Sequence, residues 1–176
     1  YKKFMPCIVV IDNNSDLIFK EKLHNLSCYV DVIFNRNNYG IAYALNQGLK
    51  YACQRNCKFL LTLDQDSFVD FITIKELINA IDIDKKIVSV GPTYSEHEYK
   101  NKIESYDVTH LITSGNLTYI KAILEVGGFD DSLFIDNVDI DFSFALRSQG
   151  YRLRKICTCF MNHKIGEYEY SSIFKI

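Results

Sequence analysis

Two acidic side chains, two positions apart, directly follow a short apolar run near the middle of the chain. Residues 58–63 are rich in Leu and Phe, and Asp64, Gln65 and Asp66 come immediately after them. Burying an ionised carboxylate is costly unless a cation or hydrogen bonds compensate for the lost water. Carboxylate oxygens are the ligands that hard cations such as Mg²⁺ and Mn²⁺ prefer. The spacing therefore predicts a metal site that serves chemistry on a phosphate-bearing substrate.

The same Asp-x-Asp spacing recurs at Asp82 and at Asp139. Asp82 falls at the end of an expected helix, where we interpret the acids as solvated surface. Asp139 lies near the start of an expected helix over 138–149, and Asp136 precedes it by three residues. Negative charge is favoured at that end of a helix, so both acids have a structural explanation. The alternative is that a half-buried Asp139 acts as a general base.

A polar turn follows the first expected strand, beginning at Asp12 and continuing through Asn13 and Asn14 to Ser15. A carboxylate at the end of a strand can accept a hydrogen bond from a ring N–H of a nucleobase. The plainer interpretation is an ordinary turn in which Ser15 caps the following helix. Residues alone leave both interpretations open.

A second polar segment precedes and enters the next expected helix. Gly40 allows the backbone to approach a ligand closely at the helix start, where free N–H groups favour phosphate. Asn46 is a polar residue within an otherwise apolar helical pattern. It therefore either faces solvent or positions a ligand.

Two further candidates lie in the second half of the chain. Ser114, Gly115 and Asn116 are small polar residues that suit either a generic turn or a pocket wall that an acceptor hydroxyl approaches closely. His163 is isolated in the sequence, and a lone histidine is more often structural than a metal ligand.

The elements that must position these residues alternate between strands and helices. Strands are expected at residues 7–11, 29–34, 59–63, 87–90, 111–113 and 151–157. Helices are expected at residues 15–26, 41–56, 71–83, 119–126 and 138–149. The fourth strand should end at Gly91-Pro92, and the stretch from 95 to 109 should be loop or edge structure. This alternation predicts an α/β sandwich with a mostly parallel central sheet.

Composition limits the chain to one domain and excludes several partners. With 176 residues, 48% of them hydrophobic, the chain can bury a single core. A net charge of −2 without a basic run argues against nucleic acid. The six cysteines are expected to be small buried hydrophobes. No transmembrane stretch and no signal peptide are expected, and the start at Tyr1 suggests a segment of a longer protein.

Taken in chain order, the segments form a recognisable series. They read Asp-Asn-Asn-Ser, Asn-x-Gly-x-Ala-x-Ala-x-Asn-x-Gly, Asp-Gln-Asp, Ser-Gly-Asn, Gly-Gly-Phe-Asp, Val-Asp-x-Asp-Phe and His-x-x-Gly. Together they resemble the family 2 inverting glycosyltransferases, with the greatest similarity to bacterial rhamnosyltransferases. The resemblance implies the GT-A fold, a nucleotide-diphospho-sugar transferase sandwich, over residues 1–176. It also implies that the usual first strand is lacking.

The resemblance assigns roles to the candidate residues. Residues 6–92 would bind the nucleotide, and residues 93–166 would carry the acceptor side and the catalytic group. Asp139 would be the catalytic base. The donor nucleotide and sugar would be bound by Asp12, Asn38, Gly40, Asn46 and Asp64. A divalent Mg²⁺ or Mn²⁺ would be held by Asp66 with His163, and the acceptor side would be formed by Ser114, Gly115, Asn116 and Asp136.

The expected activity is transfer of a sugar, such as L-rhamnose from a dTDP-activated donor, to a cell-surface polysaccharide or glycolipid. The acceptor would be a saccharide or a lipid-linked saccharide. The expected location is the cytoplasm, with peripheral association at the inner face of the membrane as an alternative. Three other readings compete with the transferase. They are a truncated, non-catalytic nucleotide-sugar-binding domain, a haloacid-dehalogenase-like phosphatase that uses the loop from Asp64, and a plain structural module.

Overall fold

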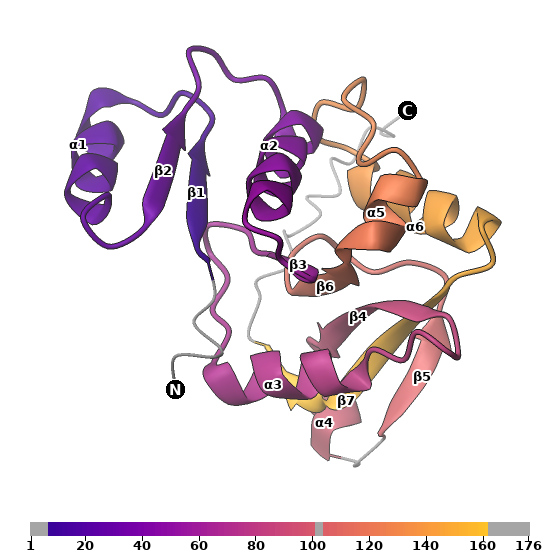
Figure 1. The fold of residues 1–176 in the computed structure, drawn as a ribbon. Helices are drawn as coiled ribbons and strands as arrows, with labels where there is room; N and C mark the ends of the chain where they lie inside the picture. The colour runs from indigo at the N-terminus through magenta and orange to yellow at the C-terminus, as the bar shows by residue number, and fades with distance from the viewer. Residues whose placement is uncertain (1–6, 101–103, 162–176) are drawn as a thin grey trace, which may run out of the picture.

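The computed structural model describes residues 7–100 and 104–161, which are the coloured parts of Figure 1. The strands are β1 (Val9–Asp12), β2 (Asp31–Phe34), β3 (Phe59–Thr62), β4 (Ile87–Thr93), β5 (Ser105–Val108), β6 (Asn116–Tyr119) and β7 (Arg152–Phe160). The helices are α1 (Leu17–Leu26), α2 (Ile41–Gln54), α3 (Phe71–Ala80), α4 (Glu96–Lys100), α5 (Ile120–Glu125) and α6 (Val138–Ser148). The predicted α/β architecture is confirmed.

The described strands form two separate sheets. β1 and β2 make a parallel pair, and the other five strands are arranged in the order β3-β6-β4-β7-β5. Within the larger sheet β4 and β7 are parallel, while β6 is antiparallel to both β3 and β4, and β5 is antiparallel to β7. β3, β4 and β7 therefore run in one direction. Among the described residues, no strand is hydrogen-bonded to both sheets.

Helices cover both faces of the larger sheet, with α5 and α6 on one side and α3 and α4 on the other (Figure 1). On the first face, Leu146 and Ile123 of the helices pack in one cluster with Val88. On the second face, Leu77 of α3 packs with Ile87 and other strand residues. Two apolar layers therefore hold the larger sheet between the helices.

Helix α2 connects the two sheets. Its apolar residues recur at helical spacing, and the buried face consists of Ala42, Gly48, Leu49 and Ala52. These side chains are mostly small, so the helix packs closely against both β1 and β3. In Figure 1 it lies between the smaller sheet and the layer formed by α5 and α6. The smaller sheet is therefore positioned by a helix rather than by a neighbouring strand.

Several predicted boundaries were wrong. The cap of α1 is Asp16 rather than Ser15, since the Asp16 carboxylate accepts the backbone N–H of Phe19. β4 continues through Pro92 to Thr93. Beyond Val90, β4 has no pairing with β6, and a proline is tolerated where no ladder hydrogen bond is required.

The second half of the chain differs most from the prediction. The strand expected at 111–113 is absent, and β6 begins at Asn116 instead. Because Asn116 and Thr118 are polar, β6 lacks the apolar run by which a buried strand is recognised. The stretch from 95 to 109, expected to be loop or edge structure, contains α4 and β5, and β5 is indeed an edge strand of the larger sheet. Of the cysteines, Cys157 and Cys159 are buried as expected, whereas Cys7 and Cys28 are exposed.

No described helix has both the length and the apolar composition needed to cross a membrane.

Candidate functional site

The acidic loop that follows β3 is fastened to the segment preceding β6. Asp64 and Asp66 are both exposed. The backbone N–H of Asp64 donates to the Oγ of buried Ser114 over 3.3 Å, and the Ser67 hydroxyl bonds the same Oγ. The backbone N–H of Gly115 donates to the Thr62 carbonyl over 2.8 Å. The structure therefore brings together the Asp-Gln-Asp and Ser-Gly-Asn segments that were predicted separately.

Tyr94 joins this arrangement from the end of β4. Its hydroxyl donates a hydrogen bond to the carbonyl oxygen of Ser114. Burial raises the pKa of Tyr94 well above its usual value, and the nearby charge of Asp64 raises it further. The phenol therefore remains a protonated donor at neutral pH. Three segments thus meet at Ser114. One follows β3, the second follows β4, and the third, which contains Ser114, precedes β6.

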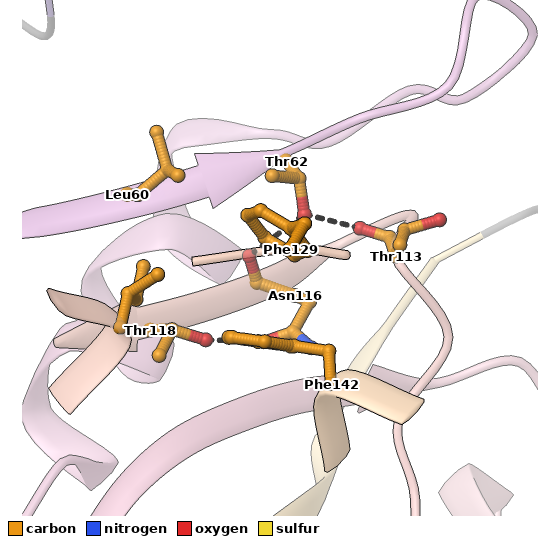
Figure 2. A pocket seen from close by; sticks show the side chains of 8 residues that line it. Leu60, Thr62, Thr113, Asn116, Thr118, Phe129 and Phe142 are labelled. Atoms are coloured by element: carbon orange, nitrogen blue, oxygen red, sulfur yellow. Dashed lines mark hydrogen bonds between the residues drawn. The ribbon is translucent and has the colours of Figure 1, made fainter. Parts of the chain in front are cut away.

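A small cavity lies in the interior below this junction, and Figure 2 shows the side chains that line it. Its volume is about 10 Å³, which is close to the space of a single water molecule. Thr62 donates to the carbonyl of Thr113 at its edge. The Asn116 Oδ1 accepts hydrogen bonds from Ser89 over 2.7 Å and from Thr118 over 2.8 Å. Asn116 therefore points into the core, with its amide oxygen engaged there.

Asp12 forms a second polar site at the carboxyl end of β1. It is only 3% exposed, and its Oδ1 accepts the backbone N–H of Ser15 over 3.1 Å. Its Oδ2 is buried and has no hydrogen-bond partner among the described residues. A buried carboxylate oxygen without a donor is costly. The position is therefore complementary to a ligand that supplies an N–H or O–H group.

The Asp12 turn is connected to the start of α2 by amide side chains. Asn13 donates to the Gly40 carbonyl over 2.8 Å, and Asn35 donates to the Asn13 Oδ1 over 2.9 Å. Asn35 also exchanges hydrogen bonds with the side chain of Gln47 on α2. This network holds the turn that contains Asp12 against the helix.

Glycine is required at position 40 by the backbone conformation and by a close contact within the protein. Its φ is +90°, and a Cβ at this position would overlap the carbonyl oxygen of Phe134. That carbonyl accepts the backbone N–H of Ile41 over 2.7 Å, while the N–H of Gly40 donates to Asn38 Oδ1 over 3.0 Å. The N–H groups of Gly40 and Ile41 are therefore bonded within the protein, and the conformation of Gly40 is explained by its contact with Phe134.

Asn46 faces the protein, not solvent. Its side chain bonds both the N–H and the carbonyl of Phe129, and it also donates to Asp131 over 2.6 Å. The loop that begins at Phe129 is therefore fixed on α2 at two points, Asn46 and Gly40. The same loop carries the exposed Asp136 and leads into α6.

Asp139 is half-buried in the first turn of α6. Its Oδ1 accepts the backbone N–H of Ile140 over 2.9 Å. No described residue bonds its Oδ2, which leaves that oxygen available to accept a proton. Among the described residues, no hydrogen bond joins Asp139 to Asp12. His163 lies outside the described residues.

The sequence interpretation missed Tyr94, Ser67 and Asn35. Tyr94 directly follows a buried strand, so the rule that ligands gather at the carboxyl ends of strands could have identified it. Ser67 is close to the acidic pair but has no distinctive spacing. The link from Asn35 to Gln47 had no signal in the sequence.

Comparison with known proteins identifies the class that this fold and these acids define. The fold is that of the GT-A glycosyltransferases. Residues 7–147 match the family model described as Glycosyl transferase family 2. This chain belongs to that family. The membership sets aside the phosphatase alternative. The acidic loop also follows the third described strand, whereas such a phosphatase would carry it after the first.

Two relatives and one solved structure illustrate the similarity. The chain is 29% identical to a dTDP-rhamnosyl transferase, RfbF, of Shigella flexneri, over 91% of this chain and 60% of that protein. It is 30% identical to a poly-beta-1,6-N-acetyl-D-glucosamine synthase of Staphylococcus aureus, over 85% of this chain and 40% of that protein. The mannosyltransferase PcManGT from Pyrobaculum calidifontis, in complex with GDP-Man and Mn²⁺, superposes with a TM-score of 0.75 at 14% identity. That match covers 92% of this chain and 48% of PcManGT. The chain thus spans between two fifths and three fifths of the length of these proteins.

Proposed function

We propose that this chain is the nucleotide-sugar-binding and catalytic part of a metal-dependent inverting glycosyltransferase. The donor is a dTDP-activated deoxysugar such as L-rhamnose, and the acceptor is a cell-surface polysaccharide or glycolipid. The observation that carries the proposal is the buried Asp12 oxygen that lacks a hydrogen-bond donor. A pyrimidine ring N–H supplies that donor, and the RfbF relative supports thymine as the base.

The acidic loop provides the oxygen ligands for a divalent cation. Among the described residues no group of three or more His, Cys, Asp or Glu side chains could hold a metal alone. Mg²⁺ is commonly held by one or two carboxylates together with substrate phosphates. Asp66, with Asp64 beside it, fits that pattern. A cation held there would supply positive charge beside the departing nucleoside diphosphate.

Asp139 is proposed as the base that accepts the proton of the attacking acceptor hydroxyl. Its Oδ1 is held by the Ile140 N–H, which fixes the direction of the carboxylate. The hydroxyl attacks the anomeric carbon on the face opposite the leaving group, which inverts the configuration. Ser114, Gly115 and Asp136 shape the acceptor side, and Asn116, whose amide oxygen is bonded to Ser89 and Thr118, anchors this segment in the core.

The test is a thermal-shift titration with dTDP-rhamnose, with and without Mn²⁺, followed by a transfer assay. A ligand that binds only the native state raises its stability. We expect Asp12→Asn to abolish the donor-induced shift. The substitution places an amide NH₂ group where one carboxylate oxygen stood, so a donor group can face the N–H of the ligand. Asp66→Asn should remove only the part of the shift that depends on Mn²⁺. Asp84→Asn, at another exposed acid, is the matched control and should behave as wild type.

Asp139→Asn separates donor binding from catalysis, since the variant should bind the donor normally and fail to transfer the sugar.

A second candidate function is a nucleotide-sugar-binding domain without turnover, and the break between β1 and β3 favours it. Donor binding without transfer or hydrolysis in the wild-type chain would support that candidate. Wild-type turnover in Asp139→Asn would show that the base is another residue.

A further inference from the structure

A cleft lies beside α2, and no residue of the acidic loop lines it. It has a volume of about 450 Å³ and opens between α2 and Ile33 of β2. This volume is in the range of small-molecule sites. One end of the cleft is formed by Asp131, in the loop that continues to Asp136. A ligand in the cleft would therefore lie close to the start of the proposed acceptor loop.

The polar groups of the cleft divide into two kinds. Some are used within the protein, since Tyr51 donates to Asp31 and the Asn46 amide is bonded to Phe129 and Asp131. Others have unused hydrogen-bonding capacity. No described residue hydrogen-bonds the Tyr43 hydroxyl, the Lys50 ammonium or the Gln54 amide, which all line the cleft. The cleft thus presents both donors and acceptors to a ligand.

Aromatic faces lie beside these polar groups. Tyr43 and Tyr51 are both half-buried lining residues. The Tyr43 ring is supported by Tyr39, with ring centroids 4.8 Å apart, and Tyr51 is supported by the Arg55 guanidinium 3.7 Å from its ring. The rings are therefore held in place before any ligand binds, which lowers the entropy lost on binding.

The charge of the cleft limits the class of ligand. Lys50 is the cation and Asp131 the anion among its lining residues, so the lining carries no net charge. Phosphate groups are bound by clustered cations or free helical N–H groups, which this surface does not offer. Aromatic faces combined with hydroxyl and amide groups match a sugar ring, which has apolar C–H faces and hydroxyl groups around its edge.

We infer that this cleft binds a neutral saccharide chain, outside the proposed donor site. The binding needs neither nucleotide nor metal, so it can be tested independently of the proposed function. The probes are a trisaccharide of L-rhamnose and chitotriose, each titrated to about 10 mM to detect dissociation constants near 1 mM. Chemical-shift changes in ¹H–¹⁵N spectra, recorded with EDTA and without nucleotide, report the residues that respond.

We expect at least one probe to shift the amides of Tyr43, Lys50 and Gln54. Gln54→Ala should weaken that binding about fivefold, the loss expected for one hydrogen bond. Tyr43→Ala should weaken it further. Gln54 is exposed, so its variant keeps the test valid even if Tyr43→Ala does not fold. Tyr29→Ala is the control, because Tyr29 is 85% exposed and lies outside the cleft.

Three outcomes would overturn the inference. The first is the absence of any shift with either saccharide. The second is unchanged saccharide affinity in both cleft variants. The third is binding of dTDP to these residues in place of the saccharides.

Discussion

Asn46 and Phe129 exchange two hydrogen bonds although they are 83 residues apart in the chain. The Asn46 Nδ2 donates to the Phe129 carbonyl over 2.7 Å, and the Phe129 N–H donates to the Asn46 Oδ1 over 3.0 Å. The side-chain amide thereby pairs with the backbone as a neighbouring strand would. Gly128 allows this approach, because a Cβ there would lie 2.7 Å from Asn46 Oδ1.

Replacing Asn46 by Ala should lower the free energy of unfolding by about 2–3 kcal/mol, because the Phe129 backbone groups lose their partners. Urea denaturation followed by circular dichroism measures the change. Gln54→Ala on the same helix is the control and should stay within about 0.5 kcal/mol of wild type. Equal stability of the two variants would mean that Asn46 does not fix the loop.

Gly40→Ala and Gly48→Ala should have opposite effects although both lie in or beside α2. The first places a Cβ against Phe134 at a φ of +90°, which costs at least about 1–2 kcal/mol. Gly48 has no atom within 4 Å of a Cβ, and alanine within a helix gains about 0.5–1 kcal/mol. Differential scanning calorimetry should show melting temperatures that move in opposite directions. A stabilised Gly40→Ala would contradict the close contact with Phe134.

Ser114→Ala should weaken Mn²⁺-dependent donor binding, because Ser114 Oγ fixes both Asp64 and Ser67. We expect a loss of about fivefold to tenfold, equivalent to one or two hydrogen bonds. Isothermal titration calorimetry with dTDP, with and without Mn²⁺, measures it. Ser143→Ala is the matched control, since Ser143 is also buried but bonds Leu111 N–H over 3.2 Å. It should lower stability and leave the effect of Mn²⁺ unchanged.

Asp107 should make the β5–β7 pair sensitive to acid. Burial of Asp107 tends to raise its pKa, but hydrogen bonds from Arg154 and Arg152 outweigh this and hold the pKa below the usual value. Stability from a carboxyl with a lowered pKa is present above its unfolded pKa of about 4. It is lost as the pH falls through the lower folded value.

Asp107→Asn should therefore lower stability by about 0.5–1 kcal/mol at pH 6, a modest value because the pair is partly exposed. The difference from wild type should shrink as the pH falls below about 4. Urea denaturation of both proteins over this pH range tests it. A difference that stays constant with pH would exclude the ion pairs as its cause.

The elements with regular apolar patterns were predicted correctly from the sequence. Helix α2 is the clearest case, because its buried residues repeat at helical spacing and small side chains mark the packed face. The acidic pair after β3 was also identified, since a strand followed by carboxylates is a local signal. These features depend on residues that are close together in the chain.

Features that depend on distant partners were not predictable. β6 pairs with both β3 and β4, and its polar Asn116 is satisfied by Ser89 and Thr118. A pattern of apolar residues does not reveal such a partnership. In the same way, Gly40 was expected to allow a close approach, but its contact with the Phe134 carbonyl, nearly a hundred residues further along the chain, was not foreseen. The local conformation was apparent, and the identity of the contacting group was not.

The separation of β1 and β2 from the larger sheet has a consequence for how tightly any donor is held. A two-stranded sheet is marginally stable alone, and α1 has no buried residue to support it. Residues 9–34 should therefore open locally without unfolding the rest of the protein. Hydrogen exchange monitored by mass spectrometry should show faster exchange there than in β4 and β7, and slower exchange when dTDP is added.

Because Asp12 lies within this opening segment, a donor that binds Asp12 as proposed would lose part of its binding free energy in closing the segment. Substitutions that stabilise the closed form, even those far from any ligand atom, should then tighten donor binding. The affinity for the donor should thus depend on how stably the smaller sheet is held against the rest of the protein, as well as on the groups that contact the nucleotide.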